Sequence, residues 1–244
     1  MILLDFNQIA LSNIFIQKLN EENMIRHMIL NSIRMYNKKY RDEYGQMVIC
    51  CDGMNTWRRE YFPEYKANRK KHRETDDSQD WNEVFRVLDL VRTEIKEYLP
   101  YKVLHMDGCE ADDIIGALTL KTQEFGQDEP IMIVSSDKDF IQLQKFKNVK
   151  QFSPMQKKLV KDKDGNPRTY LFNHIMRGDA GDGIPNVLSA DDTFISDKNQ
   201  SPLRQTRIDD WLEKSDNLRE CMDDNTYRNY QRNKKLIDLT EIPE

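Results

Sequence analysis

The chain has 244 residues, of which 38% are hydrophobic and 32% charged, and its formal net charge is −5. These values fit a globular protein with one sizeable domain and at most one smaller one. No stretch approaches the roughly 20 apolar residues needed to cross a bilayer, and the start of the chain lacks the pattern of a signal peptide. Adjacent Cys50 and Cys51 argue against a disulfide framework. We therefore expect a cytoplasmic protein with no membrane contact.

The negative net charge conceals two basic segments. Residues 57–73 carry seven Lys or Arg against two Glu, and residues 138–163 carry eight Lys against two Asp. A chain of this kind can bind phosphate at chosen places while the rest of its surface repels it. Solvated surface lysines are the alternative interpretation of either segment taken alone.

Four short apolar runs predict buried strands, at residues 1–4, 47–51, 102–106 and 131–134. Helical periodicity appears between them, at residues 26–40 and 82–99. This alternation predicts an α/β fold with a mostly parallel central sheet flanked by helices.

Four further segments are less regular. Residues 56–80 form a long basic and aromatic excursion around Pro63, which is typical of functional loops. Residues 158–170 suggest a hairpin that turns at 164–167. Residues 171–187 suggest a helix, a glycine-rich turn and the start of a second helix, and residues 225–239 a further helix.

Acidic residues follow each of the four predicted strands. In an open parallel sheet, ligands bind beyond the carboxyl ends of the strands, so these side chains should meet at one edge. Two carboxylates about 4 Å apart repel by roughly 4 kcal/mol at an effective dielectric of 20, unless a cation lies between them. Mg²⁺ is the natural cation, with Mn²⁺ as a substitute, and two such ions would suit phosphoryl transfer. The acids are Asp5, Asp52, Glu110, Asp112, Asp113, Asp137 and Asp139.

Each acid also has a structural alternative, because Asp and Glu commonly cap helices or fill a first helical turn. Caps do not require every strand to end in an acid, however, so the set as a whole favours a metal site. Asp179 and Asp182 lie in a glycine-rich turn with Gly178, Gly181 and Gly183, where backbone N–H groups can approach a phosphate.

The chain resembles the phage and bacterial 5′-nuclease family, the flap endonucleases. The resemblance rests on Leu4-Asp5-Phe6, Cys51-Asp52, Glu110-Ala-Asp-Asp113, Ser135-Ser-Asp-Lys-Asp139-Phe and Gly178-Asp-Ala-Gly-Asp182, in the family's order over residues 1 to about 190. It implies a PIN-like catalytic domain at residues 1–165, with a helical arch at about 54–80. It further implies a smaller helical region at residues 166–244, with a helix–turn–helix duplex-binding element.

The resemblance also implies roles for individual residues. Asp5, Asp52, Glu110, Asp112, Asp137 and Asp139 would serve a first Mg²⁺, and Asp113, Asp179 and Asp182 a second. Lys66 and Arg69, together with Asp139, would be catalytic. The expected nucleic-acid-binding residues are Arg58, Arg59, Tyr61, Lys66, Arg69, Lys70, Lys157, Lys158, Gly178, Gly181 and Gly183.

The resulting hypothesis is a metal-dependent 5′→3′ exonuclease and flap endonuclease that removes RNA primers during phage DNA replication in a bacterial cytoplasm. We expect a monomer that binds branched or 5′-ended DNA and RNA–DNA duplexes, with a single-strand-binding protein and a sliding clamp as further partners. The alternatives are a PIN-type single-strand endoribonuclease and a non-catalytic binder of branched DNA. A phosphatase with a nucleophilic Asp-x-Asp is disfavoured, because Asp5 is followed by Phe6-Asn7.

Overall fold

The structure is a computed structural model, and it describes every residue except 18–20, 70–72, 74–79, 163–164, 197 and 244. Its internal contacts divide the chain into two compact units. Unit 1 consists of Met1–Thr56 and Ser78–Lys161, and unit 2 of Trp57–Asp77 and Asp162–Glu244. The domain boundary expected at residue 165 stays a prediction.

Unit 1 contains a six-stranded sheet with the order β3-β2-β1-β4-β5-β6. Strands β1 to β5 run parallel and β6 pairs antiparallel with β5. The bounds are β1 Ile2–Asp5, β2 Met47–Cys51, β3 Lys102–His105, β4 Ile131–Val134, β5 Val149–Ser153 and β6 Lys158–Leu159. All four predicted strands are present, and β1, β2 and β4 are buried as expected, whereas β3, at the edge of the sheet, is partly exposed. The fifth, β5, was not predicted, because polar residues interrupt its apolar pattern.

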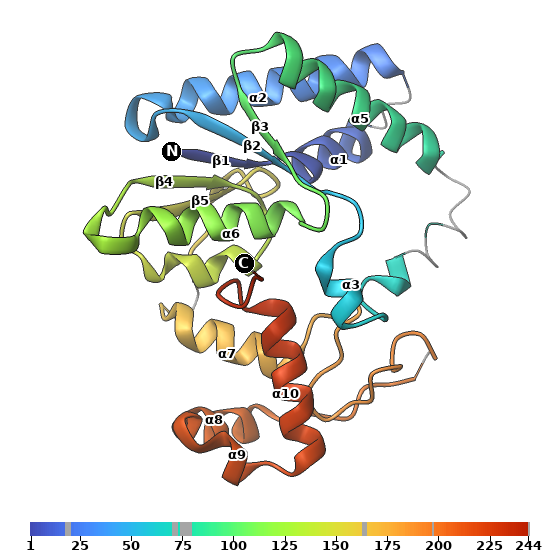
Figure 1. Ribbon diagram of the computed structural model, residues 1–244, viewed down its shortest axis with the longest axis vertical. Coiled ribbons are helices and arrows are strands. Elements are labelled where there is room, and N and C mark those ends of the chain that lie inside the picture. Colours follow the sequence, from blue (N-terminus) through green and yellow to red (C-terminus); the bar gives the residue numbers. More distant parts are fainter. Residues whose placement is uncertain (18–20, 70–72, 74–79, 163–164, 197, 244) are drawn as a thin grey trace. The chain divides into compact units, whose positions relative to one another are not determined.

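Helices cover both faces of this sheet (Figure 1). On one face, alternate strand residues such as Leu4 and Ile49 are buried with α1, α2 and α5 in a single apolar cluster. The opposite face carries α6. The helices of unit 1 are α1 Phe6–Gln17, α2 Glu22–Tyr44, α5 Trp81–Tyr98 and α6 Ala111–Thr122, with the 3-10 helices η1 Glu124–Gly126 and η2 Asp139–Lys145. The predicted helices at 26–40 and 82–99 are confirmed as α2 and α5.

The strand register brings the carboxyl ends of neighbouring strands to the same edge. Asp5 of β1 is paired with Cys50 of β2, and Cys51 with His105 of β3. On the other side of β1, Leu4 is paired with Val134 of β4. The loops that follow these four strands therefore begin at one edge of the sheet.

Unit 2 is helical. Its elements are α3 Trp57–Tyr61, α7 Pro167–Arg177, α8 Gln205–Glu213, η3 Ser215–Asn217, α9 Leu218–Cys221 and α10 Asp224–Ile237. Phe62 and Tyr65 are buried in one cluster with Ile175, Ile184 and Leu236. The segment after α3 is therefore part of the core of this unit. The predicted helix at 225–239 is confirmed as α10.

Two local predictions are wrong. The hairpin turn lies at residues 154–157 between β5 and β6, whereas Pro167 begins α7. Asn166 caps that helix by accepting hydrogen bonds from the amides of Arg168 and Thr169, and proline is well suited to a first helical position. The second helix expected after the glycine-rich turn is absent at 185–196 and 198–204, and the next helix is α8.

None of the helices in the described part of the chain is both long and apolar enough to cross a membrane.

Candidate active site

Asp5, the last residue of β1, is the buried centre of the carboxyl edge, with 6% of its surface exposed. Its Oδ1 accepts a hydrogen bond from the amide of Gln8 at 3.1 Å, and its Oδ2 accepts one from the Ser135 hydroxyl at 2.9 Å. Burial, and to a smaller extent the carboxylates of Asp52 and Asp137, raise the pKa of this carboxyl to about 7, against the lowering effect of the two hydrogen bonds. Asp5 is therefore a buried carboxyl that lies close enough to Asp52 and Asp137 to feel their charges.

Asp52 directly follows β2 and is held by two other elements. Its Oδ2 accepts a hydrogen bond from the Asn7 side chain of α1 at 2.7 Å, and its Oδ1 accepts one from the amide of Ala111 at the start of α6 at 2.8 Å. Asn7 was not predicted as a site residue. Its position two residues after a strand-end aspartate, in the first turn of a helix, was the available signal.

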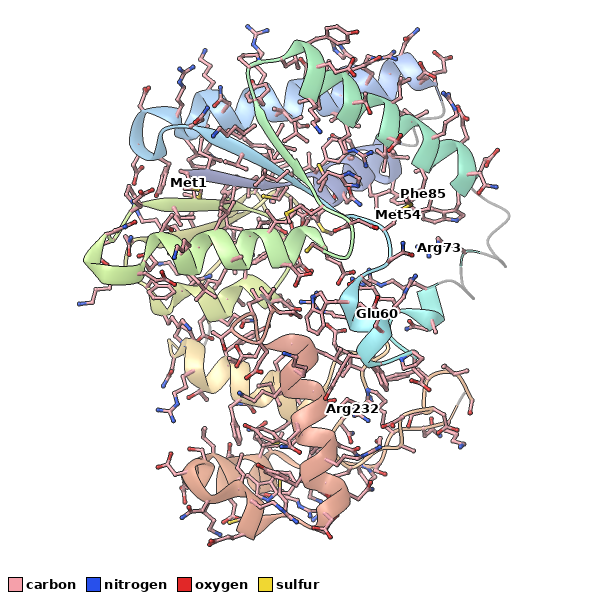
Figure 2. The ribbon with its side chains drawn as sticks, in the orientation of Figure 1. Met1, Met54, Glu60, Arg73, Phe85 and Arg232 are labelled. Atoms are coloured by element: carbon pink, nitrogen blue, oxygen red, sulfur yellow. The ribbon has the colours of Figure 1, made fainter. Side chains whose placement is uncertain are left out.

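The loops after β2 and β3 are tied together at Gly53. Its amide donates to the Cys109 carbonyl at 2.8 Å, and the amide of Gly108 donates to the Met54 carbonyl at 2.7 Å. A Cβ atom on Gly53 would lie 1.8 Å from the Met106 carbonyl oxygen, so only glycine fits. Met54, labelled in Figure 2, marks this loop. The close approach fixes the two loops that carry Asp52 and the acids of α6.

The acids at the start of α6 divide into two roles. Glu110 and Asp113 form a reciprocal capping box, in which the Glu110 side chain accepts from the amide of Asp113, and Asp113 Oδ2 accepts from the amide of Glu110 at 2.9 Å. Both are buried. Asp112 is half-buried. The pKa of the nearby Cys50 thiol is raised, first by the burial of Cys50 itself and then by surrounding charges that include those of Asp5 and Asp112. Asp5 and Asp112 therefore both lie close enough to Cys50 to influence its thiol.

The loop after β4 brings in Asp137 and Asp139. The Ser135 hydroxyl, which donates to Asp5, accepts a hydrogen bond from the amide of Asp137 at 3.1 Å. Asp137 Oδ1 in turn accepts from the amide of Asp139 at 2.9 Å. The Gln151 side chain of β5 donates to the carbonyls of Ser135, at 3.0 Å, and Asp137. Ser135 and Gln151 thus position the loop, and neither was predicted to do so.

Unit 2 holds the remaining acids. Asp179 Oδ1 accepts hydrogen bonds from the amides of Gly181, at 2.7 Å, and Asp182, at 3.2 Å, which closes the glycine-rich turn. Its Oδ2 lies 3.5 Å from His174 Nε2, and the hydrogen bond with His174 lowers the pKa of Asp179 to about 2. Gly178 begins the turn with φ 67°, and a Cβ there would lie 2.3 Å from the Ile184 carbonyl oxygen.

Asp182 contacts three residues of the segment after α3. Its Oδ1 pairs with the Arg69 guanidinium. Its Oδ2 lies 3.5 Å from Lys66 Nζ and accepts a hydrogen bond from the Tyr65 hydroxyl at 3.0 Å. The two expected catalytic cations and an expected metal-site acid therefore form one cluster within unit 2.

The other expected nucleic-acid-binding residues differ in exposure. Arg59 and Tyr61 are exposed on α3, and Lys157 and Lys158 are exposed at the β5–β6 turn. Arg58 is only 4% exposed, and its Nε donates to the Leu236 carbonyl at 2.9 Å, so its guanidinium has a structural partner inside unit 2. Gly181 is exposed, Gly178 is half-buried and Gly183 is buried in the turn, and Lys70 lies outside the described residues.

Comparisons of the sequence with known proteins agree on one family. Residues 1–168 match the family model described as "5'-3' exonuclease, N-terminal resolvase-like domain". The Ribonuclease H of Enterobacteria phage T4 is 38% identical over 99% of this chain and 82% of its own length. A 5'-3' exonuclease of Buchnera aphidicola (strain APS) is 31% identical over 62% of this chain and 50% of its own length.

Solved structures show the same fold. The T5 5'-exonuclease with bound zinc ions superposes with a TM-score of 0.71 at 18% identity, covering 98% of this chain and 89% of that one. The T5 D15 flap endonuclease, in a pseudo-enzyme–product complex with DNA and metal ions, gives 0.68 at 20% identity, covering 98% and 88%.

The sheet is mostly parallel and brings carboxylates together at its carboxyl edge. This arrangement is typical of hydrolases that use divalent cations. Within that class, the chain belongs to the 5′–3′ exonuclease family. The resemblance stated from the motifs is therefore confirmed, and so is the PIN-like fold.

Proposed function

We propose that the chain is a Mg²⁺-dependent 5′→3′ exonuclease and flap endonuclease. Its substrates are DNA and RNA–DNA duplexes with 5′ ends or flaps, and its role is the removal of RNA primers during phage DNA replication. The observation that carries the proposal is the set of strand-end carboxylates around Asp5. The pKa of Asp5 is raised to about 7 by its burial and by the charges of Asp52 and Asp137. Family membership supports the same activity.

The residues present fit a hard divalent cation. The donors at the carboxyl edge are carboxylate oxygens, which Mg²⁺ and Mn²⁺ prefer. Asp5, Asp52, Asp112, Asp137 and Asp139 are the side chains that would hold the ions, with Glu110 and Asp113 shaping the start of α6 behind them. When bound, such ions neutralise charge on the phosphodiester and activate a water molecule for attack.

The remaining work falls to side chains and amides of this chain. Lys66 and Arg69 would hold the phosphate at the cleavage position and offset its charge. Tyr61, half exposed on α3, offers a ring for an unpaired base, and such stacking is worth about 1–3 kcal/mol per base. The exposed Arg59 and Lys158 would contact the phosphate backbone without discriminating between sequences.

The wider setting is also part of the proposal. A monomer acting in the cytoplasm of a bacterial host, beside a sliding clamp and a single-strand-binding protein, would match a role in lagging-strand synthesis. The relationship to the Ribonuclease H of phage T4 supports this setting.

The test is cleavage of a 5′-flap duplex, a nicked RNA–DNA duplex and an unstructured RNA, each with Mg²⁺ and again with EDTA. We expect the two duplexes to be cut only with Mg²⁺, and we expect Asp139→Asn to abolish cutting while binding survives. Preferential cutting of the unstructured RNA would favour the endoribonuclease. Binding with no cutting under any condition would favour a non-catalytic binder.

A further inference from the structure

Arg232 of α10, labelled in Figure 2, is a buried charge that the proposed reaction does not use. Only 6% of its surface is exposed. Its Nη1 is paired with the Asp191 carboxylate, and its Nη2 donates to the Pro185 carbonyl at 2.9 Å. Its Nε donates to the side chain of Asn233 at 3.0 Å. A buried cation is costly unless it is paired and hydrogen-bonded, so each of these contacts also constrains the segment that supplies it.

The same guanidinium lies against the segment after α3. Its Cζ is 5.3 Å from the centre of the Phe62 ring, which is a cation–π contact, and Phe62 is 4% exposed. Phe62 begins the segment that carries Lys66 and Arg69. Pro185 closely follows the glycine-rich turn. Arg232 therefore contacts both segments with one side chain.

The segment after α3 and the glycine-rich turn also contact each other directly. The amide of Lys66 donates to the Asp182 carbonyl at 2.8 Å, and Arg69 Nε donates to the Gly181 carbonyl at 2.9 Å. The Arg69 side chain is 48% exposed, so water competes for its hydrogen bonds. Its position beside the turn therefore depends also on the buried residues that anchor its segment.

Two asparagines of α10 hold the chain beyond the turn independently of Arg232. Asn233 donates to the Pro185 carbonyl at 2.9 Å, and Asn229 donates to the Val187 carbonyl at 3.0 Å. Both asparagines are fully buried. These bonds remain when Arg232 is replaced, so the turn should keep its place on α10. The additional effect of Arg232 is its link to the segment after α3.

We propose that Arg232 is a positioning residue that couples the cationic segment after α3 to the glycine-rich turn. Through the Phe62 ring it sets where Lys66 and Arg69 lie relative to the turn, so that both segments engage one nucleic acid together. This coupling rests on the proposed function, because it assumes that Lys66 and Arg69 contact a phosphate. Arg232 itself is buried and acts only through these neighbours. Segments that are ordered in advance bind more tightly than segments that must be ordered by the substrate.

The test is a double-mutant cycle for binding of a 5′-flap duplex, measured in EDTA by fluorescence anisotropy. In wild type, Arg69→Gln should weaken binding at least about fivefold, because it removes a charge-assisted contact with a phosphate. In the Arg232→Met background the same change should weaken binding less than about twofold, because Arg69 is no longer held in place. A merely structural role of Arg232 would leave the two effects additive. Additive effects, or an Arg69→Gln protein that binds as tightly as wild type, would overturn the proposal.

Arg228→Met is the matched control. Arg228 lies one helical turn away on α10 and is paired with the same Asp191, but its side chain is 56% exposed. In the Arg228→Met background, Arg69→Gln should therefore keep its full effect of at least about fivefold. An effect reduced as much as in Arg232→Met would show a general loosening of α10 and contradict the specific role of Arg232.

Phe62→Leu tests the same link with Arg232 left in place. It keeps an apolar side chain in the core and removes the ring, so the effect of Arg69→Gln should fall below about threefold. A full effect in this background would contradict the link through Phe62. Cleavage of the duplex by wild type with Mg²⁺ is scored separately. Binding that follows the cycle without any cleavage would remove the proposed activity and leave the coupling intact.

Discussion

Asp5→Asn should stabilise the metal-free protein at neutral and alkaline pH while weakening its affinity for divalent cations. The substitution keeps the size of the side chain and removes its charge. The Asp5 carboxyl has a pKa near 7 in the folded chain, mainly because it is buried and because Asp52 lies close, against 3.8 for an ordinary aspartate. Between about pH 4 and pH 7, Asp5 is therefore protonated in the folded state and ionised in the unfolded state.

The sign and size of the effect follow from this difference. A raised pKa in the folded state gives a stability contribution that is complete below pH 3.8 and is lost as the pH rises through 7. A shift of about three units, at 1.36 kcal/mol per unit, corresponds to roughly 4 kcal/mol at pH 8. Between pH 5 and pH 8 the stability of Asp5→Asn relative to wild type should therefore rise by about 2–3 kcal/mol. Asp179, with a pKa near 2, does not titrate in this range.

The assay is urea unfolding of both proteins in EDTA at pH 5, 6, 7 and 8. Addition of Mg²⁺ at pH 8 should reverse the order, because wild type gains stability from ligand binding and the variant gains much less. A stability difference that stays constant from pH 5 to pH 8 would refute the argument, since it would mean that Asp5 is already ionised in the metal-free fold at pH 5.

Three other substitutions test single contacts. Asn7→Ala removes the side-chain donor that orients Asp52. It should weaken Mn²⁺ binding about tenfold in a calorimetric titration, and an unchanged affinity would contradict this role. Gly53→Ala would place a Cβ 1.8 Å from the Met106 carbonyl oxygen and should cost more than about 3 kcal/mol in urea unfolding; a loss below 1 kcal/mol would show that the loops yield easily. Arg58→Gln removes a buried hydrogen-bonded guanidinium and should destabilise the protein by about 2–3 kcal/mol without altering the slope of log K for DNA binding against the logarithm of salt concentration; a slope reduced by about 0.9 would instead make Arg58 a phosphate ligand.

The strand-end acids could be predicted because two simple patterns coincide in them. Apolar runs mark buried strands, and parallel strands place whatever follows them at one edge, so Asp5 and Asp52 were identified without any knowledge of pairing. The support around them could not be found in this way. Gln151 is 1% exposed on β5 and binds two carbonyls of the loop after β4, but a glutamine between Lys150 and Phe152 carries no signal of burial.

Contacts between residues far apart in the sequence also could not be predicted from local patterns. Tyr65 and Asp182 are 117 positions apart, and Arg58 and the Leu236 carbonyl are 178 positions apart. A basic run indicates attraction to phosphate, yet it does not separate the buried Arg58 from the exposed Arg59, because both follow Trp57 on the same short helix. In the same way, a Gly-Asp turn indicates an acidic site but not that its second acid contacts cationic side chains of the segment after α3.

Direct measurement of Mn²⁺ binding by electron paramagnetic resonance tests the central claim, that carboxylates from separate strands share divalent cations. Wild type should bind Mn²⁺, and Asp5→Asn and Asp52→Asn should each weaken that binding by at least about tenfold while remaining folded. Mn²⁺ affinity that is the same in all three proteins would contradict the account.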